Sequence, residues 1–336
     1  AKERAAIIRE WHDLVLANAD DLAMLMTLEQ GKPLAEAKGE IAYASWFIEW
    51  FAEEGKRAYG EVIPQTIADR RIVVIKEPVG VVAAITPWNF PAAMITRKAG
   101  PALAAGCPIV LKPASSTPYT ATALVELADR AGVPTGVINL LSGSAQAIGG
   151  EMTKNPTVRK LSFTGSTEIG KELMAQCAGT IKKVSLQLGG NAPLIVFDDC
   201  DQDNALNNIM TAIFSGNGCS CIAGSLLILN ENIYDAFLEK LVSRAKDIKL
   251  GSPLDDQSQM GPLNNLKQVE NDCISLKKGT AINCREYDHE IGKFTHKKKI
   301  KKKDFILVIG LHALYPRRLR SFIDLSIYLD VEDNLR

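Results

Sequence analysis

The feature that most constrains the fold is a regular alternation of short apolar runs and helix-like segments between residues 79 and 188. The apolar runs are short and contain β-branched residues, which is typical of buried strands. Strands separated by helices form parallel sheets whose two faces the helices cover, so the sequence predicts an α/β fold. The predicted strands span 79–86, 108–111, 137–141, 158–163 and 183–188, and the predicted helices span 92–105, 118–131 and segments beginning at 146 and 166.

Segments on either side of this alternation have their own patterns. Residues 3–54 carry apolar side chains at helical spacing, interrupted at Gln30-Gly31-Lys32-Pro33, which predicts two long antiparallel helices. Residues 60–77 contain an extended run, Arg71 to Lys76, which predicts a strand in a hairpin that leaves the main body. A second, shorter α/β run follows, with predicted strands at 192–197 and 226–229 and predicted helices at 201–214 and 233–246.

Composition excludes several classes of protein. The 336 residues favour roughly two domains, and 39 basic against 39 acidic residues give no reason to expect nucleic acid or an anionic membrane as a partner. Seven cysteines in a large α/β chain favour reduced thiols over a disulfide framework. No apolar run is long enough for a membrane span, and we expect a cytoplasmic location. The chain begins at Ala1 within a helical pattern, which suggests a truncated product.

The regular pattern ends near Thr280. Beyond it the chain has a basic run, His296 to Lys303, and an apolar run, Phe305 to Leu311. The basic run is either a patch that binds nucleic acid or another polyanion, or a solvated, disordered tail, and the second interpretation is favoured. We therefore predict a dinucleotide-binding domain at 1–188, a partial catalytic domain at 189–279 and a divergent basic tail at 280–336.

Cys221 is the candidate nucleophile of the chain. It lies in the segment Phe214-Ser-Gly-Asn-Gly-Cys-Ser-Cys-Ile-Ala-Gly, where glycines allow the backbone to pack closely around it. A strand that ends in Leu188-Gly-Gly-Asn191 precedes this segment. A cysteine attacks as the thiolate, and a tight pocket of small residues suits that chemistry. The alternative is a buried, inert cysteine, which is the commonest fate of a lone cysteine.

These two segments resemble the aldehyde dehydrogenase family, whose members carry Leu-Glu-Leu-Gly-Gly followed by Gly-Gln-x-Cys. Gln187 and Cys221 are 34 positions apart, which fits the family spacing, and the resemblance extends over about 270 residues. It implies a parallel-sheet dinucleotide-binding domain, an incomplete α/β catalytic domain and a small β-flap at 60–77. Family members are homo-oligomers that assemble through this flap and a C-terminal strand that the sequence lacks. Gln187 stands at the family's glutamate, and Cys219 stands at its glutamine.

The segment Thr86-Pro-Trp-Asn-Phe-Pro91 follows a predicted strand and matches the family's oxyanion motif. The resemblance implies that the Asn89 amide and the Cys221 backbone N–H donate to the alkoxide formed when a thiolate attacks an aldehyde. It also implies that Thr86 and Trp88 lie beside the cofactor. The alternative is an ordinary turn rich in asparagine and proline.

Two further turns are implied to bind the cofactor. Lys112 and Ser115 follow the next strand, at positions that meet the adenosine ribose in the family. An acidic residue there would repel a 2′-phosphate, whereas Ser115 is neutral, so NADP is favoured over NAD. Gly165 and Ser166 connect a strand to a helix, where helix N–H groups can face a pyrophosphate. The alternatives are a surface lysine for Lys112 and a simple helix cap for Ser166.

Gln187 decides the predicted activity. In the family the glutamate at this position activates the water that hydrolyses the thioester, and an amide cannot accept that proton. Loss of a general base costs ~10²- to 10⁴-fold. The family's downstream Glu-x-Phe-Gly-Pro segment also has no counterpart here. The predicted function is therefore oxidation of an aldehyde with NADP or NAD at an impaired rate, and the alternatives are a pseudoenzyme that binds nucleotide or subunits without turnover, or a product without function.

The aldehyde is predicted from residues 46–60, which resemble succinate-semialdehyde dehydrogenases more closely than other branches of the family. Arg57 would then pair with the distal carboxylate of the substrate through its planar fork of donors. A second arginine expected for this substrate is Ser215 here. The alternative for Arg57 is a solvated arginine at a helix end, and the two interpretations have equal weight. No metal site is predicted.

Overall fold

The structure is a computed structural model that describes residues 1–262, 282–288 and 293–300. The chain divides into two compact units. Unit 1 comprises Ala1–Glu29 and Ala37–Leu188, and unit 2 comprises Gln30–Glu36 together with the described residues from Gly189 onward. None of the helices in the described ranges is long and apolar enough to cross a membrane.

Unit 1 is built on a five-stranded sheet with the order β5-β4-β3-β6-β7. All neighbouring strands are parallel, so Ala83 on β3 lies between Val110 on β4 and Leu161 on β6. Parallel strands of this kind are apolar on both faces, which explains why the sequence shows continuous apolar runs here. The strands are β3 (Val81–Ile85), β4 (Ile109–Lys112), β5 (Ile138–Leu140), β6 (Val158–Thr164) and β7 (Lys183–Gln187).

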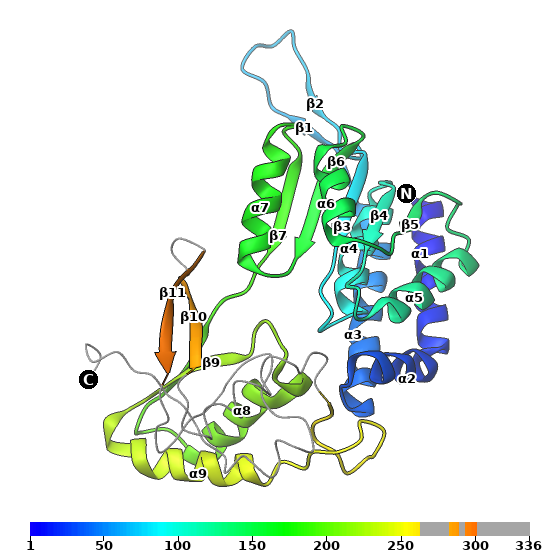
Figure 1. The fold of residues 1–336 in the computed structure, drawn as a ribbon. Helices are drawn as coiled ribbons and strands as arrows, with labels where there is room; N and C mark the ends of the chain where they lie inside the picture. The colour runs from blue at the N-terminus through cyan, green and yellow to red at the C-terminus, as the bar shows by residue number, and fades with distance from the viewer. Residues whose placement is uncertain (263–281, 289–292, 301–336) are drawn as a thin grey trace. The chain divides into compact units, whose positions relative to one another are not determined.

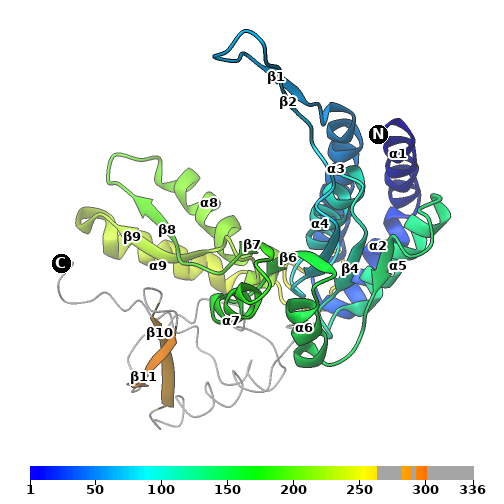
Figure 2. The same ribbon diagram turned by 90° about the horizontal axis from the view of Figure 1, so that it is seen from above.

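Helices cover both faces of this sheet, as predicted. They are α4 (Ala93–Ala104), α5 (Pro118–Arg130), α6 (Ala145–Lys154) and α7 (Thr167–Ala178). Figures 1 and 2 show α6 and α7 on one face and α4 on the opposite face. On the α6 and α7 face, Met152, Leu173 and Cys177 pack with Leu161 and Phe163 of β6 in one apolar cluster. Burial of such side chains is the main stabilising term of the unit.

The N-terminal region contains three helices, so the prediction of two is wrong. The helices are α1 (Lys2–Ala17), α2 (Ala19–Gln30) and α3 (Leu34–Glu54). The additional break falls at Asn18, whose backbone leaves the helical region at φ −109° and ψ 20°. Its side-chain Nδ2 donates to Leu14 O at 2.8 Å, and this local bond competes with continuation of the helix.

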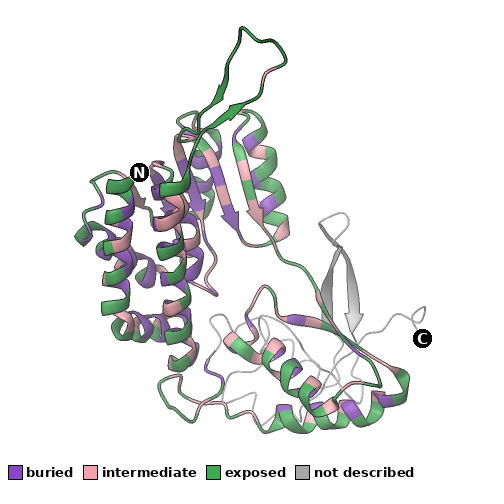
Figure 3. Ribbon diagram, turned by 180° about the vertical axis from the view of Figure 1, so that it is seen from behind, coloured by how far each residue is buried: buried purple, intermediate pink, exposed green. Residues whose placement is uncertain are grey.

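Buried side chains of the N-terminal helices pack against the helices that cover the sheet. Trp11 of α1 is 1% exposed, and its indole Nε1 donates to Leu124 O on α5 at 3.0 Å. Ile41 and Ile48 of α3 are fully buried, seven residues apart on one face of the helix. Figure 3 shows buried residues along the inner faces of these helices and exposed residues along the outer faces.

A two-stranded antiparallel hairpin extends from unit 1, formed by β1 (Glu61–Ile63) and β2 (Ile72–Val74). A short 3₁₀ turn, η1 (Gly55–Arg57), precedes it. The strand predicted over residues 71–76 is therefore present but shorter. Val62 and Val73 are 74% and 63% exposed, so the apolar residues of the hairpin face solvent in the single chain. Figure 1 shows the hairpin projecting beyond the end of the sheet.

Unit 2 contains a second, smaller α/β arrangement. Its strands β8 (Ala192–Val196) and β9 (Gly224–Leu229) pair in parallel and are connected through α8 (Gln202–Phe214) and the 3₁₀ turn η2 (Ser215–Gly218). The 3₁₀ turn η3 (Glu231–Ile233) leads into α9 (Tyr234–Lys246). Phe237 and Leu241 of α9 pack against Ile209 and Ile213 of α8 in the core of this unit.

The basic run at 296–303 was predicted to be a solvated, disordered tail, and this prediction is wrong for residues 296–300. Residues Ile282–Asp288 form β10 and residues Lys293–Ile300 form β11, paired as an antiparallel hairpin. Part of the basic run predicted at 296–303 therefore lies in a strand. The predictions for residues 263–281, 289–292 and 301–336 lie outside the described residues.

Candidate functional site

The carboxyl ends of four neighbouring strands carry most of the predicted site residues. Thr86 follows β3, Lys112 ends β4, Gly165 and Ser166 follow β6, and Gln187 ends β7. Because β4, β3, β6 and β7 are parallel and adjacent in that order, these ends meet at one edge of the sheet. Open α/β sheets bind ligands at this edge. The fold thus brings together residues that are up to about a hundred positions apart in sequence.

The loop after β3 contains Asn89, whose side chain is buried. Glu40 of α3, a buried acidic residue, holds the C-terminal end of this loop. Glu40 Oε1 accepts hydrogen bonds from Ala92 N at 2.9 Å and from Ala93 N at 3.2 Å. These are N–H groups at the start of α4, which lack partners within the helix and favour a negative charge. The loop that carries Asn89 therefore runs between a strand end and a capped helix.

Lys112 and Ser115 differ in exposure. Lys112 is buried, its Nζ donates to Pro113 O at 3.1 Å, and burial lowers the pKa of this amine. Ser115 is exposed, and Trp88 in the neighbouring loop is half-buried. The segment after β4 therefore presents a neutral hydroxyl to solvent at Ser115.

The turn after β6 leads into α7. Ser166 is the N-cap of this helix, and its Oγ accepts from Ile169 N at 3.4 Å, so the helix-cap interpretation is confirmed. Gly165 N donates to Gln187 O at 3.1 Å, which ties the turn to the end of β7. A Cβ at Gly165 would lie 2.5 Å from the Phe163 ring, so the close packing of the turn requires glycine.

Two buried hydroxyls at this edge have no hydrogen-bond partner among the described residues. They are Thr86 Oγ1, just after β3, and Thr164 Oγ1, at the end of β6. Buried polar groups are rarely left unsatisfied, and a ligand is one way to satisfy them. The hydroxyls, the Lys112 ammonium and the N-terminus of α7 fit an elongated ligand that carries phosphates and ribose hydroxyls. A dinucleotide has this chemistry.

Gln187 contacts an arginine that was not predicted as a site residue. Arg97 of α4 donates from Nη1 to Gln187 Oε1 at 3.3 Å and from Nη2 to the Tyr43 hydroxyl at 2.6 Å. Its guanidinium lies 4.7 Å from the centre of the Phe47 ring. Stacking on an aromatic ring and a hydrogen bond on each terminal nitrogen hold the guanidinium in one place.

A signal for Arg97 was present in the sequence. Arg97 and Lys98 are adjacent cations inside the otherwise apolar segment 92–105, eight and nine residues after Asn89. Charged residues are seldom buried in such a segment unless they have partners, so the pair indicates a polar site. The contiguous motif that contains Asn89 ends at Pro91 and does not reach these two residues.

Lys98 lies beside Arg97 on the sheet side of α4. It is 9% exposed, and its Nζ donates to Ser162 Oγ at 3.0 Å. Burial is the main cause that lowers the pKa of this amine to about 8, and the nearby charges of Arg97 and Lys160 contribute to the same shift. Two adjacent cations of α4 thus face polar groups on β6 and β7, Lys98 at Ser162 and Arg97 at Gln187.

Cys221 belongs to unit 2, and its side chain is half-buried. It follows the η2 turn, and Ala223 N donates to Ser220 O at 3.1 Å to close a turn around it. Cys219 is buried, its Sγ donates to Asn217 O at 3.4 Å, and burial raises the pKa of this thiol to about 11. Of the two neighbouring cysteines, Cys221 is the more accessible.

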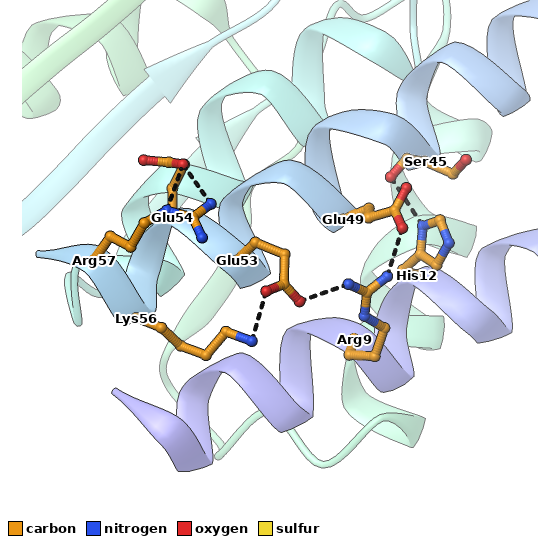
Figure 4. A network of polar contacts seen from close by, with 8 residues as sticks. All are labelled: Arg9, His12, Ser45, Glu49, Glu53, Glu54, Lys56 and Arg57. Atoms are coloured by element: carbon orange, nitrogen blue, oxygen red, sulfur yellow. Dashed lines mark hydrogen bonds and ion pairs between the residues drawn. The ribbon is translucent and has the colours of Figure 1, made fainter.

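Arg57 lies in a network of ion pairs on the surface of unit 1, drawn in Figure 4. Its Nη2 and Nε donate to Glu54 Oε1 at 2.6 Å and 3.0 Å, and half of its side chain is exposed. Nearby, Arg9 of α1 pairs with Glu49 and Glu53 of α3 at 2.8 Å each. The geometry of Arg57 resembles the surface alternative stated for it, and its substrate role stays a prediction.

The sequence matches the model of the Aldehyde dehydrogenase family over residues 1–285. The chain belongs to the aldehyde dehydrogenase family. The match extends a few residues beyond Thr280, where the resemblance was predicted to end. The parallel sheet of unit 1 belongs to this family fold.

Two curated relatives are semialdehyde dehydrogenases. The chain is 60% identical over 296 residues to "Succinate-semialdehyde dehydrogenase [NADP(+)] GabD" of Escherichia coli, covering 87% of this chain and 61% of that protein. It is 61% identical over 269 residues to "Glutarate-semialdehyde dehydrogenase" of Pseudomonas putida, covering 80% of this chain and 56% of that protein. The chain therefore spans roughly three fifths of the length of these relatives.

Solved structures give the same result. An E. coli "NADP dependent enzyme" superimposes with a TM-score of 0.79 at 57% identity, over 89% of this chain and 63% of that one. Succinate-semialdehyde dehydrogenase from Burkholderia pseudomallei superimposes with a TM-score of 0.79 at 54% identity, over 89% and 63%. At this identity the fold of the matched part is shared.

Proposed function

We propose that the chain oxidises a small aldehyde to a carboxylate, with NADP or NAD, through a thiohemiacetal and a thioester on Cys221. The observation that carries the proposal is the convergence of Thr86, Lys112, Ser166 and Gln187 at one carboxyl edge of a parallel sheet. Family membership and the semialdehyde dehydrogenases among its relatives support it. Because the chain spans 61% or less of these two relatives, the activity of the whole protein is part of the proposal.

The first step is attack of the Cys221 thiolate on the carbonyl carbon. A carbon–sulfur bond forms, and the carbonyl electrons move to oxygen as an alkoxide. We assign the Asn89 amide and the Cys221 backbone N–H as donors to this oxygen. Removing one such donor typically costs ~10²- to 10³-fold in rate. The capped start of α4 supports this assignment, because it fixes the loop that carries Asn89.

When bound, the dinucleotide supplies the hydride acceptor. Ser166 and the N-terminus of α7 would face its pyrophosphate, with Gly165 allowing the close turn. Lys112 and Ser115 would meet the adenosine ribose, with Thr86 and Trp88 beside the cofactor. The neutral, exposed Ser115 favours NADP, because it leaves room for a 2′-phosphate and does not repel it.

Hydrolysis of the thioester is the step that we expect to be slow. Water must lose a proton in this step, and Gln187 stands where the family has a glutamate. Arg97 donates to Gln187 Oε1, so the amide oxygen is already engaged and its NH₂ group is a donor only. An amide in this arrangement cannot act as a general base at neutral pH.

Arg97 is the arginine that best suits a carboxylate-bearing aldehyde. Nη1 donates to Gln187 and Nη2 donates to Tyr43, and each nitrogen carries a second N–H, so a carboxylate could accept from both. Arg57, the residue predicted for this role, already pairs with Glu54 on the surface. We therefore propose Arg97 for the distal carboxylate of a semialdehyde and retain Arg57 as the competing candidate.

Assembly with other subunits is also proposed. The β1–β2 hairpin exposes Val62 and Val73, which is costly for a free chain and suits a strand-pairing interface. The resemblance implies homo-oligomerisation through this flap. Light scattering coupled to gel filtration would test it, and a monomer at micromolar concentration would contradict it.

A second candidate function is nucleotide binding without turnover. Gln187 favours it, because the residues at the sheet edge that suit a dinucleotide are retained while the base is replaced. Under this alternative the chain would bind NADP or associate with related subunits and would not oxidise aldehydes.

Two measurements on the full chain separate these functions. Titration calorimetry with NADP and NAD measures binding, and absorbance of reduced nicotinamide with succinate semialdehyde measures oxidation. Binding together with formation of reduced nicotinamide supports the enzyme, and binding alone supports the second candidate. Failure to bind either dinucleotide would contradict the enzyme and the nucleotide-binding form of the second candidate. A Cys221→Ala variant is the control, since it should bind normally and form no product.

A further inference from the structure

The segment that leads to Cys221 has an unusual backbone. Gly216, Asn217 and Gly218 are consecutive residues with φ of 64°, 58° and 68°, all in the left-handed region. Glycine adopts this region freely, and asparagine is among the few other residues that tolerate it. The α8 helix ends just before this segment, and Cys221 follows Asn217 by four positions. The loop therefore depends on an asparagine in a conformation that most residues avoid.

The Asn217 side chain bonds to two distant segments of unit 2. It is 2% exposed, and its Nδ2 donates to Gly31 O at 3.0 Å and to Pro262 O at 3.3 Å. Its Oδ1 accepts from Gly261 N at 2.9 Å. Both N–H groups and the oxygen of the amide are thus used, and buried amides satisfied in this way specify one arrangement.

The two segments that Asn217 joins also touch each other. A Cβ on Gly261 would overlap the Gly31 carbonyl oxygen, and a Cβ on Gly31 would overlap the Pro262 carbonyl oxygen. The backbones are therefore too close for any side chain at these two positions. Leu34 N adds a further bond to Pro253 O at 2.9 Å. Residues 30–36 and 253–262 thus form a fixed base beneath the loop.

Glu36 and Cys219 make further hydrogen bonds to the backbone of the same loop. The Glu36 carboxylate accepts from Gly216 N with its two oxygens, at 3.1 Å and 3.0 Å. The buried Cys219 thiol donates to Asn217 O at 3.4 Å. Glu36 therefore attaches the loop on its N-terminal side and Asn217 attaches it at its centre, while the Cys219 thiol closes a bond within the loop.

We propose that Asn217 is a positioning residue that fixes the loop presenting the Cys221 thiol by tying it to residues 31, 261 and 262. The inference rests on the proposed function only for the role of Cys221 as nucleophile. Asparagine meets both requirements of the site, because it tolerates the left-handed backbone and its amide supplies two donors and one acceptor. Glycine meets only the first requirement, and aspartate at neutral pH lacks both donors.

The test measures thiol accessibility in the full chain without aldehyde or dinucleotide, so its outcome is independent of turnover. Iodoacetamide labelling at pH 8, read by peptide mass spectrometry, gives separate rates for Cys221 and Cys219. In the wild type Cys221 should react much faster, because Cys219 is buried and protonated. In Asn217→Gly the backbone conformation is retained and the tether is lost, and the ratio of the two rates should fall at least ~10-fold as Cys219 becomes accessible.

A matched control separates local release from general loosening. Asp201 caps α8 in the same unit through bonds to Asp203 N and Asn204 N, so Asp201→Ala destabilises the unit without touching the tether. The ratio should remain at the wild-type value in Asp201→Ala. A ratio that falls equally in both variants, or that does not fall in Asn217→Gly, would overturn the proposal.

The conservative variant adds a pH-dependent readout. Asn217→Asp presents a carboxylate to two carbonyl oxygens at neutral pH, so its Cys219 should be as accessible as in the glycine variant. Protonation restores one O–H donor, and Cys219 protection should then recover as the pH falls towards 4, measured with 4,4′-dithiodipyridine, which reacts with thiols in mild acid. A purely packing role for residue 217 predicts no recovery, and that result would also overturn the proposal.

Discussion

The carboxyl edge of the sheet and the loop that carries Cys221 achieve their geometry by different means. At the sheet edge, Gln187 and Lys112 end strands whose positions are fixed by the backbone hydrogen bonds of the parallel ladder. In the loop, Asn217 fixes a left-handed segment through side-chain bonds to residues from remote parts of unit 2. The strand ends are therefore held mainly by backbone bonds. The loop is held mainly by bonds from the side chains of Asn217 and Glu36.

Departures from the family pattern occur in both regions. Gln187 retains the strand position of the family's glutamate while it removes the proton acceptor. Cys219 replaces the family's glutamine in the loop with a buried thiol, next to the tether of Asn217. The comparison indicates that the geometry of a site and its proton chemistry are encoded by separate residues. Variants that alter one without the other test this view.

The largest effect is expected from Gln187→Glu. A carboxylate on the same strand restores a general base, so steady turnover should rise by ~10²-fold or more while the first-turnover amplitude stays unchanged. Steady-state and stopped-flow absorbance of reduced nicotinamide measure both quantities. Gln187→Asn is the control, since it keeps an amide and should not raise the rate. An unchanged steady rate with an intact first turnover would show that another step is limiting.

A smaller effect is expected from Arg97, measured in the Gln187→Glu background. Arg97→Leu removes a charge-assisted donor pair worth about 1.5–3 kcal/mol, so KM for succinate semialdehyde should rise ~10- to 100-fold. KM for an uncharged aldehyde such as propanal should change little. The matched variant Arg57→Leu only breaks a surface ion pair with Glu54, and it should leave both values within about twofold. The reverse result would assign the substrate carboxylate to Arg57.

The cofactor preference should depend on Ser115. In Ser115→Glu a carboxylate approaches the 2′-phosphate, and a like-charge interaction at this range should weaken NADP binding ~10-fold and leave NAD binding nearly unchanged. Titration calorimetry of the wild type and the variant measures both affinities, with Ser115→Gln as the uncharged control. Tighter binding of NAD than NADP by the wild type would contradict the assignment.

The smallest effect concerns the buried Lys98. Its pKa in the folded chain is about 8, below the unfolded value near 10.4, so between these values the unfolded state binds more protons. The free energy of unfolding should therefore increase as pH rises through this window, by at most roughly 3 kcal/mol. Urea unfolding of the wild type from pH 7 to pH 10 should show this slope, and Lys98→Met should reduce it. Parallel curves for the two proteins would contradict the environment described for Lys98.

The sheet of unit 1 could be predicted because the apolar runs of its strands and the helical spacing between them are both local features of the sequence. The apolar runs at 79–86 and 158–163 correspond to β3 and β6, since strands buried on both faces consist of consecutive apolar residues. The break at Asn18 was missed because it depends on one side-chain bond to Leu14 O and not on a glycine or proline. The hairpin of β10 and β11 was missed because its lysine-rich sequence suggested a solvated tail.

Candidate site residues were found where a motif is contiguous, as in Thr86 to Pro91 and Gly165 to Ser166. Arg97 was missed because its contact with Gln187 joins a helix to a strand ninety residues later. The role of Asn217 depends on contacts with residues 31 and 262 that no sequence spacing reveals. The roles predicted for Cys221, Asn89 and Arg57, and the cytoplasmic location, stay predictions.

The central claim is that the chain carries the residues for attack and hydride transfer and lacks the base for thioester hydrolysis. Stopped-flow mixing of the wild-type chain with NADP and succinate semialdehyde tests it directly, with the Cys221→Ala variant as the blank. The account predicts a burst of at most one reduced nicotinamide per chain, followed by a rate close to the blank. Sustained turnover at a rate equal to that of Gln187→Glu would contradict it, because another group would then be activating the water.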